Sequence, residues 1–374
     1  MTKYLYIEHP FQLEHGGEFP HVRLAYHTYG TLNEQKDNVI WVCHALTANS
    51  DAQDWWPGLV GPNCTIDCDR YFVVCVNMLG SCYGSTNPQD INPDTGEAYG
   101  LDWPLVTTRD FARILDLAAD YLGIHRIRLL MGGSMGGQHA LEWASLHPNR
   151  FDLLCVLATN AFHSAWGIAF NETQRMALRA DQTLGTGVPE AGKAGLEAAR
   201  AIGMLSYRHY RTYIDAQTGL NTPSQGPEDY RATSYQRYQG NKLWKRFEPT
   251  AYYALSRGMD SHHLGRGRTS EEDPDGLATG LSRITATSLV IGIDTDILFP
   301  LEEQGLISRH IPNSRFEVIH SDYGHDGFLT EAIPIGELLA DFLADQLKVD
   351  QNTKHAFTES LTGRKFALPG TEEV

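Results

Sequence analysis

One serine of the sequence has neighbours that are typical of an activated nucleophile. The segment Gly132–Gly136 follows an apolar run at residues 127–131 and opens a helical pattern. Its glycines permit a tight strand-to-helix turn, which lifts the hydroxyl of Ser134 above a sheet. The same turn leaves the backbone N–H of Met135 at a helix N-terminus, where it can stabilise an oxyanion. We therefore predict that Ser134 is a nucleophile, against the alternative of a glycine-rich turn that only packs a helix on a strand.

A nucleophilic serine needs a base and an acid that orients the base, and in this arrangement the acid precedes the base in the chain. His325 is the predicted base, because it lies in a polar, glycine-flanked loop just past the strand pattern at 315–319. His320 is a weaker candidate, since it still lies in that strand pattern. The acid is Asp294 or Asp296, and spacing alone does not separate two residues of one loop.

A second oxyanion donor is expected in the turn after an early strand. His44, Ala45, Leu46 and Thr47 follow the apolar run at 39–42. The backbone N–H of Leu46 is the candidate donor. His44 precedes the serine in the chain and sits at a strand end, so we interpret it as structural.

The elements that must position these residues alternate along the chain. Short runs rich in Val, Ile and Leu favour strands buried on both faces, as in a parallel sheet. They lie at residues 22–26, 39–42, 71–76, 127–131, 153–157, 288–293 and 315–319. Helical spacing over 111–122, after Ser134 and near 335–347 lies between or after them. The alternation predicts an α/β sheet.

The middle of the chain differs from its flanks. Residues 165–281 show little strand pattern and several helical stretches, which favours an insertion over the carboxyl edge of the sheet, where ligands bind in open α/β folds. The predicted organisation is an α/β core at 1–164 and 282–350, a helical cap at 165–281 and a polar tail at 351–374. Within the cap, the charged, glycine-rich segment 264–275 is expected to be a solvated loop.

Composition excludes several classes of protein. The formal net charge is −16 and no Lys/Arg-rich run occurs, so a nucleic-acid partner is not expected. We expect no membrane partner either, because the sequence contains neither a signal peptide nor an apolar stretch of about 20 residues. Cysteines in strand-like runs indicate a reduced, cytoplasmic protein. Cys64 and Cys68 could contribute to a zinc site, but without two further ligands we expect no metal.

Longer stretches of the chain, between about residues 10 and 345, resemble the homoserine O-acetyltransferase family of the α/β-hydrolase superfamily. They are 44–47, 70–77, 82–86, 132–137 with 140–143, 171–175, 239–242 with 246–247, 296–300 and 324–326. The resemblance implies an α/β-hydrolase fold whose mostly parallel sheet is flanked by helices and carries an inserted cap. It also implies an enzyme of methionine biosynthesis that moves an acetyl group from acetyl-CoA to L-homoserine through an acyl-serine. The resemblance implies no permanent cofactor. It also implies a homodimer that is built through the cap.

The resemblance also assigns roles to residues that spacing leaves open. The family's Ser/Thr-Asp-x-Leu-aromatic-Pro pattern falls on Asp296, which becomes the acid. Arg200 and Tyr207 match the spacing of the family's carboxylate-binding arginine and its tyrosine, and an arginine fork suits both oxygens of a carboxylate. Asp326 resembles the residue that binds the substrate ammonium, and Thr47 is implied as a further substrate contact.

Departures from the family pattern flank the expected pocket. They occur at Asn49–Ser50, at Ser81 and over 182–188. Succinyl therefore stays open as the donor acyl group, and serine stays open as the acceptor. A plain esterase or thioesterase of the same fold and a non-catalytic binding protein are the rival hypotheses.

Overall fold

The computed structural model describes residues 1–221 and 229–345. The predicted tail at 351–374 and the last residues of the helix predicted near 335–347 lie outside these ranges. Within them, eight strands form one sheet in the order β1-β4-β6-β5-β7-β8-β9-β10. The strands are β1 (Lys3–Ile7), β4 (Val22–Tyr29), β5 (Val39–Cys43), β6 (Phe72–Val76), β7 (Ile127–Gly133), β8 (Phe151–Leu157), β9 (Thr287–Ile293) and β10 (Ser314–Ile319).

The sheet is parallel from β6 through β10, as predicted, and its other edge is antiparallel. The strand β4 pairs antiparallel with both β1 and β6. The strand β5 pairs parallel with β6 and with β7, and the pairs β7–β8, β8–β9 and β9–β10 are also parallel. The short strands β2 (Phe11–Gln12) and β3 (Glu18–Phe19) pair separately. The carboxyl ends of the parallel strands therefore meet at one edge of the sheet.

Both faces of the sheet are buried, and side chains alternate between two hydrophobic clusters. Along β5, Val39 and Trp41 belong to one cluster, while Ile40 and Val42 belong to the other. This period of two is what a strand covered on both faces requires, and it explains the continuous apolar runs of the sequence.

Helices cover each face. The first cluster includes residues of α2 (Thr108–Tyr121), α3 (Met135–Leu146), α9 (Leu277–Ser282) and α10 (Leu301–His310). The second packs against α1 (Ala52–Trp55), α11 (Gly327–Thr330) and a helix over 332–345. The start of α2 is fixed by a capping box, in which the N–H of Asp110 donates to Thr107 Oγ1 and the N–H of Thr107 donates to Asp110 Oδ2, both at 3.0 Å.

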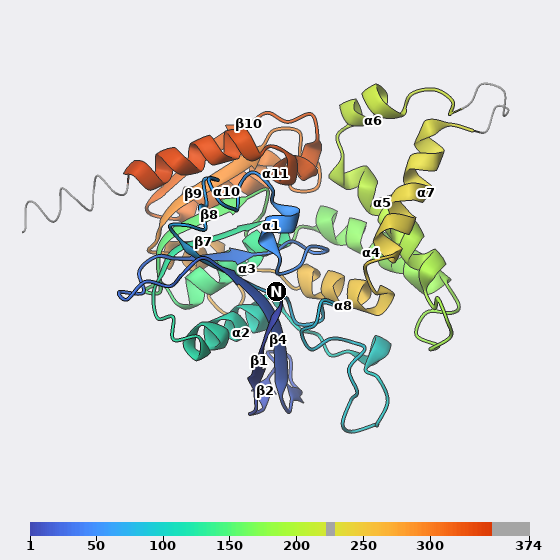
Figure 1. The fold of residues 1–374 in the computed structure, drawn as a ribbon, viewed down its shortest axis with the longest axis horizontal. Helices are drawn as coiled ribbons and strands as arrows, with labels where there is room; N and C mark the ends of the chain where they lie inside the picture. The colour runs from blue at the N-terminus through green and yellow to red at the C-terminus, as the bar shows by residue number, and fades with distance from the viewer. Residues whose placement is uncertain (222–228, 346–374) are drawn as a thin grey trace, which may run out of the picture.

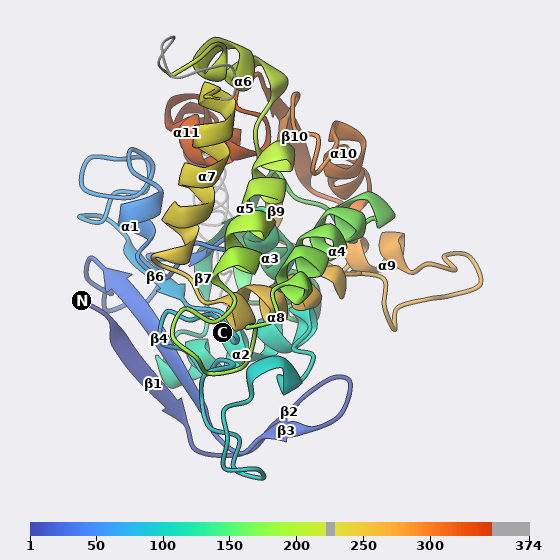
Figure 2. The ribbon, with the colours of Figure 1, turned by 90° about the vertical axis from the view of Figure 1, so that its right-hand side faces the viewer.

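Further helices lie between β8 and β9 in the chain. They are α4 (Ala165–Ala180), α5 (Lys193–Tyr207), α6 (Tyr210–Gln217), α7 (Arg231–Trp244) and α8 (Pro249–Asp260). The ribbon shows α4 to α7 gathered on one side of the sheet, in the green and yellow part of the chain (Figures 1 and 2). Helix α5 packs between α4 and α7. This is the segment predicted as a cap.

The prediction of a solvated loop over Leu264–Asp275 is wrong in its first half. Arg268 Nη2 lies 2.8 Å from Glu142 Oε1, and the two side chains are 6% and 0% exposed. Arg266 pairs in the same way with Glu14 at 2.8 Å. The charges that suggested solvation are therefore used in ion pairs that hold the loop to the core.

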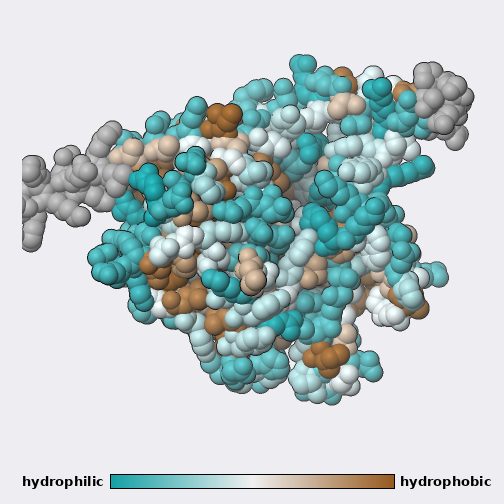
Figure 3. Space-filling model, in the orientation of Figure 1, coloured by the Kyte–Doolittle hydropathy of each residue, from teal (hydrophilic) through white to brown (hydrophobic). Residues whose placement is uncertain are grey.

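The outer surface is mainly polar on the face that Figure 3 shows, with hydrophobic side chains in small groups. Among the described helices, none is both long enough and apolar enough to cross a membrane.

Candidate active site

Ser134 occupies a strained turn between β7 and α3. Its backbone has φ 56° and ψ −130°, a conformation that costs a non-glycine residue about 1–3 kcal/mol and is typical of functional sites. The turn is held because the N–H of Ser134 donates to Leu157 O at 3.0 Å. A Cβ on Gly136 would lie 2.1 Å from Cys43 O, so glycine is required there. The sequence motif thus forms the elbow that it predicted.

The structure brings Ser134, His325 and Asp296 together at the carboxyl edge of the sheet. His325 Nε2 lies 2.9 Å from Ser134 Oγ, and His325 Nδ1 lies 2.7 Å from Asp296 Oδ2. The three residues are 5%, 3% and 4% exposed, respectively. A chain of hydrogen bonds from hydroxyl to imidazole to carboxylate is the arrangement that lets an imidazole take the proton of a nucleophile.

The structure separates the two aspartates that the sequence left open. Asp296 Oδ1 accepts hydrogen bonds from the N–H groups of Leu298 and Phe299 at 2.8 and 2.9 Å, which leaves Oδ2 for His325. Asp294 instead lies 2.6 Å from Nδ1 of His320 and raises the pKa of this exposed imidazole. Asp294 therefore supports the loop, and only Asp296 orients His325.

Three aromatic rings surround the imidazole of His325. The ring centres of Phe299, Phe328 and Tyr207 lie 5.1, 5.3 and 6.0 Å from the imidazole centre. Because these rings limit rotation of the imidazole and exclude water, they preserve its alignment with Ser134.

Both residues predicted to supply oxyanion donors lie at the site. Met135 is the first residue of α3, where backbone N–H groups have no partner within the helix. Leu46 lies in the turn after β5 and lines the same cavity as Ser134. His44 supports this turn: the N–H of Met78 donates to its Nε2 at 3.1 Å, and its Nδ1 lies 2.9 Å from Ala45 O. Burial lowers the pKa of His44 to about 4, so the imidazole is neutral at pH 7.

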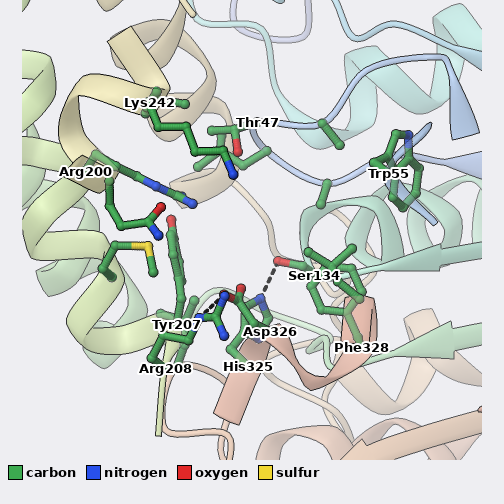
Figure 4. Close-up of a pocket in the computed structure, with 18 of the residues that line it drawn as sticks. Thr47, Trp55, Ser134, Arg200, Tyr207, Arg208, Lys242, His325, Asp326 and Phe328 are labelled. Carbon is green, nitrogen blue, oxygen red and sulfur yellow. Dashed lines mark hydrogen bonds and ion pairs between the residues drawn. The ribbon is translucent and has the colours of Figure 1, made fainter. Parts of the chain in front are cut away.

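Ser134 opens into a cavity of about 330 Å³ that lies between the core and the helices α4, α5, α7 and α8 (Figure 4). The core contributes residues of the turn after β5, of α1 and of the His325 loop, and the inserted helices contribute a cationic wall. Charged lining residues are Asp54, Arg200, Arg208, Lys242, Arg246 and Asp326. A cavity with both charges around a nucleophile suits a substrate that is itself charged.

Arg200 and Tyr207, paired by spacing in the sequence, lie together on α5. The guanidinium carbon of Arg200 lies 5.2 Å from the centre of the Tyr207 ring. Within the described part of the chain, the buried Nε of Arg200 has no hydrogen-bond acceptor. Burial raises the pKa of Tyr207, so its hydroxyl stays protonated. An arginine with an unused buried donor in a cavity is a candidate anchor for a carboxylate.

Sequence reasoning missed two arginines that join the inserted helices to the core. Arg208 Nε lies 2.8 Å from Asp326 Oδ2, in ion-pair contact, although this N–H does not point along a hydrogen bond. Arg246 Nη1 donates to Thr47 O at 2.5 Å and to the Tyr83 hydroxyl at 2.8 Å. Thr47, predicted as a substrate contact, does line the cavity. The signal for Arg208 in the sequence is only its place directly after Tyr207.

No cluster of metal-ligating side chains occurs among the described residues.

Residues 38–332 match the family described as alpha/beta hydrolase fold. The chain is 47% identical over 337 residues to homoserine O-acetyltransferase of Cyclobacterium marinum, covering 90% of this chain and 93% of that protein. Its fold is similar to homoserine O-acetyltransferase from Bacillus anthracis, with TM-score 0.82, 23% identity and coverage of 92% and 97%. It is also similar in fold to the acetyl esterase MekB, with TM-score 0.79, 23% identity and coverage of 92% and 97%.

Proposed function

Since the chain belongs to the homoserine O-acetyltransferase family of the alpha/beta hydrolase fold, we propose that it transfers an acetyl group from acetyl-CoA to the hydroxyl of L-homoserine. The products are O-acetyl-L-homoserine and CoA, an exchange that belongs to methionine biosynthesis. The observation that carries the proposal is the aligned set of Ser134, His325 and Asp296, which opens into a cavity with an unpartnered arginine donor.

The first half of the reaction forms an acyl-serine. His325 Nε2 takes the proton of Ser134 Oγ as the oxygen attacks the thioester carbonyl carbon, and Asp296 stabilises the imidazolium. The oxyanion is held by the N–H groups of Leu46 and Met135, each contributing about 3 kcal/mol to the transition state. The carbon–sulfur bond then breaks, and the thiolate takes the proton from Nε2 and leaves as CoA.

The second half returns the acetyl group to a hydroxyl. Homoserine binds with its carboxylate on Arg200 and its ammonium on Asp326. Tyr207 and Thr47 line the space between these anchors. The substrate hydroxyl gives its proton to His325 Nε2 and attacks the acyl carbon, after which Ser134 Oγ leaves and recovers that proton. Two anchors on one small molecule hold the hydroxyl near attack geometry, which favours transfer over attack by water.

The proposal includes the assembly and location of the enzyme. We infer that the helical segment 165–281 forms a cap, that two copies associate through it, and that the enzyme works in the cytoplasm. Exposed apolar side chains on α4, α5 and α6 support an association face: Trp166, Met176, Leu205 and Ile214. Light scattering of the purified protein tests the dimer, and a monomer at micromolar concentration would contradict it.

The decisive experiment measures release of CoA thiol from acetyl-CoA with and without homoserine, together with mass spectrometry of the product. Thiol release that depends on homoserine and yields the acetyl ester supports the proposal. Release of CoA thiol that does not depend on homoserine, with no acetyl ester formed, would identify an esterase or thioesterase instead.

Two controls complete the experiment. Ser134→Ala should abolish turnover, and retained turnover would contradict the mechanism. Offering succinyl-CoA beside acetyl-CoA, and serine beside homoserine, determines the donor and the acceptor from the mass of the trapped acyl-enzyme and of the product.

A further inference from the structure

The ion pair between Arg208 and Asp326 connects two parts of the site that lie far apart in the sequence. Arg208 directly follows α5, the helix that carries Arg200 and Tyr207, and Asp326 directly follows His325. The Arg208 and Asp326 side chains are 24% and 13% exposed, so water screens their charges only partly. The ring of Tyr323 lies 5.8 Å from the guanidinium carbon of Arg208 and supports it from the loop.

The backbone of the two segments is also in direct contact beneath this pair. Gly324 has φ +64°, and a Cβ there would lie 2.8 Å from His209 N and 3.1 Å from Arg208 C. Only glycine therefore allows the histidine loop to approach the end of α5 this closely. The approach fixes where the Asp326 carboxylate can meet the Arg208 guanidinium.

Asp326 shares the cavity with cations of the inserted segment, and Arg200 and Arg208 are those on α5 and at its end. Arg200 and Arg208 line the same cavity as Asp326, and both Arg200 and Asp326 act electrostatically on Tyr207. A carboxylate free to rotate in an empty cavity is attracted to any nearby guanidinium. If Asp326 paired with Arg200, the two anchors proposed for the acceptor would neutralise each other.

We propose that Arg208 is a positioning residue that holds the Asp326 carboxylate away from Arg200 and thereby sets the preference for acceptors that carry an ammonium beside a carboxylate. The inference rests on the proposed function, in which these two residues bind the ends of an amino acid. Because Arg208 engages Oδ2, the other oxygen of Asp326 can accept from the substrate ammonium. Figure 4 shows Arg208 and Asp326 joined beside His325, with Arg200 on the same helical wall.

The test compares two acceptors in four proteins. L-Homoserine and 4-hydroxybutanoate have the same chain length and hydroxyl, but the second lacks the ammonium. Their kcat/KM ratio is measured with acetyl-CoA for the wild type, Arg208→Met, Arg208→Lys and Arg211→Met, the last removing an exposed cation three residues further along the chain. We expect the homoserine preference to fall about tenfold in Arg208→Met, equivalent to about 1.4 kcal/mol. Arg208→Lys should recover part of it, and Arg211→Met should retain it.

Each result has a defined meaning. A wild type that prefers homoserine and an Arg208→Met variant with the same preference would overturn the role of Arg208 but leave the proposed function intact. Equal loss in Arg211→Met would overturn it too. A wild type without any preference would contradict the proposed function and, with it, the ammonium site that Arg208 positions. The burst of CoA thiol should fall less than the acceptor kcat/KM, and a larger fall in the burst would show that Arg208 acts on acylation instead.

Discussion

Replacing Asp296 with Asn tests the proposed network of Ser134, His325 and Asp296 at the residue whose two side-chain oxygens both have fixed partners. The N–H groups of Leu298 and Phe299 donate to Asp296 Oδ1 at 2.8 and 2.9 Å. In Asp296→Asn these donors select the amide oxygen for that position, so the NH₂ group faces Nδ1 of His325. An amide donor there forces the imidazole proton onto Nε2, the nitrogen that must accept the proton of Ser134.

The expected loss follows from this wrong tautomer. We expect kcat to fall about 10⁴-fold, which corresponds to about 5.5 kcal/mol of transition-state stabilisation. The assay is homoserine-dependent release of CoA thiol at saturating acetyl-CoA. Stability should change little, because the backbone donors keep their acceptor, and thermal unfolding of the variant checks this.

Asp294→Asn is the matched control. Asp294 pairs with His320, whose side chain is 71% exposed, and such surface pairs contribute about 0–1 kcal/mol to stability. We expect Asp294→Asn to keep kcat within about threefold of the wild type. Such a change corresponds to less activation free energy than the ~1.4 kcal/mol of a tenfold change. If Asp296→Asn kept more than about a tenth of the wild-type kcat, or if both variants lost activity equally, the assignment of the acid would be refuted.

Three further predictions concern the elbow, the acceptor site and pH. Gly136→Ala places a Cβ 2.1 Å from Cys43 O, so thermal unfolding should show a loss of about 1–3 kcal/mol and activity should fall; an unchanged melting temperature would contradict the packing argument. Arg200→Met should raise the KM for homoserine at least about tenfold, a loss of about 1.4 kcal/mol, with a smaller change in the KM for acetyl-CoA; equal changes would count against a carboxylate anchor. Burial lowers the pKa of three histidines to about 4, about 3 and about 4, namely His44, His139 and His163. Histidines of the unfolded chain have a pKa of about 6.5 and bind protons below that pH, whereas these three in the folded chain do not. The free energy of unfolding should therefore be greatest above pH 6.5 and fall toward pH 4. At pH 5 each histidine should lower it by up to about 2 kcal/mol. Urea unfolding at pH 7 and pH 5 measures this, and equal midpoints would refute it.

The sequence was most informative where chemistry and local structure depend on the same few residues. A G-x-S-x-G segment between a buried strand pattern and a helical pattern has few other uses, so Ser134 was found without tertiary information. His325 was found because the carboxyl ends of parallel strands converge, which makes a polar loop after a late strand a neighbour of the elbow. The parallel sheet was predictable for the same reason, since strands covered on both faces leave continuous apolar runs.

Features that depend on contacts between distant segments were not predictable. Without a family pattern, choosing Asp296 over Asp294 requires knowledge of the path of the loop. The turn at Leu298 and Phe299 binds Oδ1 of Asp296 and leaves Oδ2 for His325. Arg208 lies 118 positions before Asp326, and no periodicity links them. Local composition predicts that the charges of segment 264–275 are solvated, because it does not reveal distant partners such as Glu142 on α3.

Hydrolysis and transfer differ in the molecule that attacks the acyl-serine. The elbow, the base and the acid serve hydrolysis and transfer equally, since both proceed through an acyl-serine. Water also needs no anchor, whereas an amino acid needs one for each of its charged ends. In the proposed function these anchors are Arg200, whose buried Nε has no partner among the described residues, and the carboxylate of Asp326. If the acceptor is decided there, changes at Arg200 or Arg208 should shift the enzyme toward thiol release without ester, while changes at Ser134 should stop both reactions.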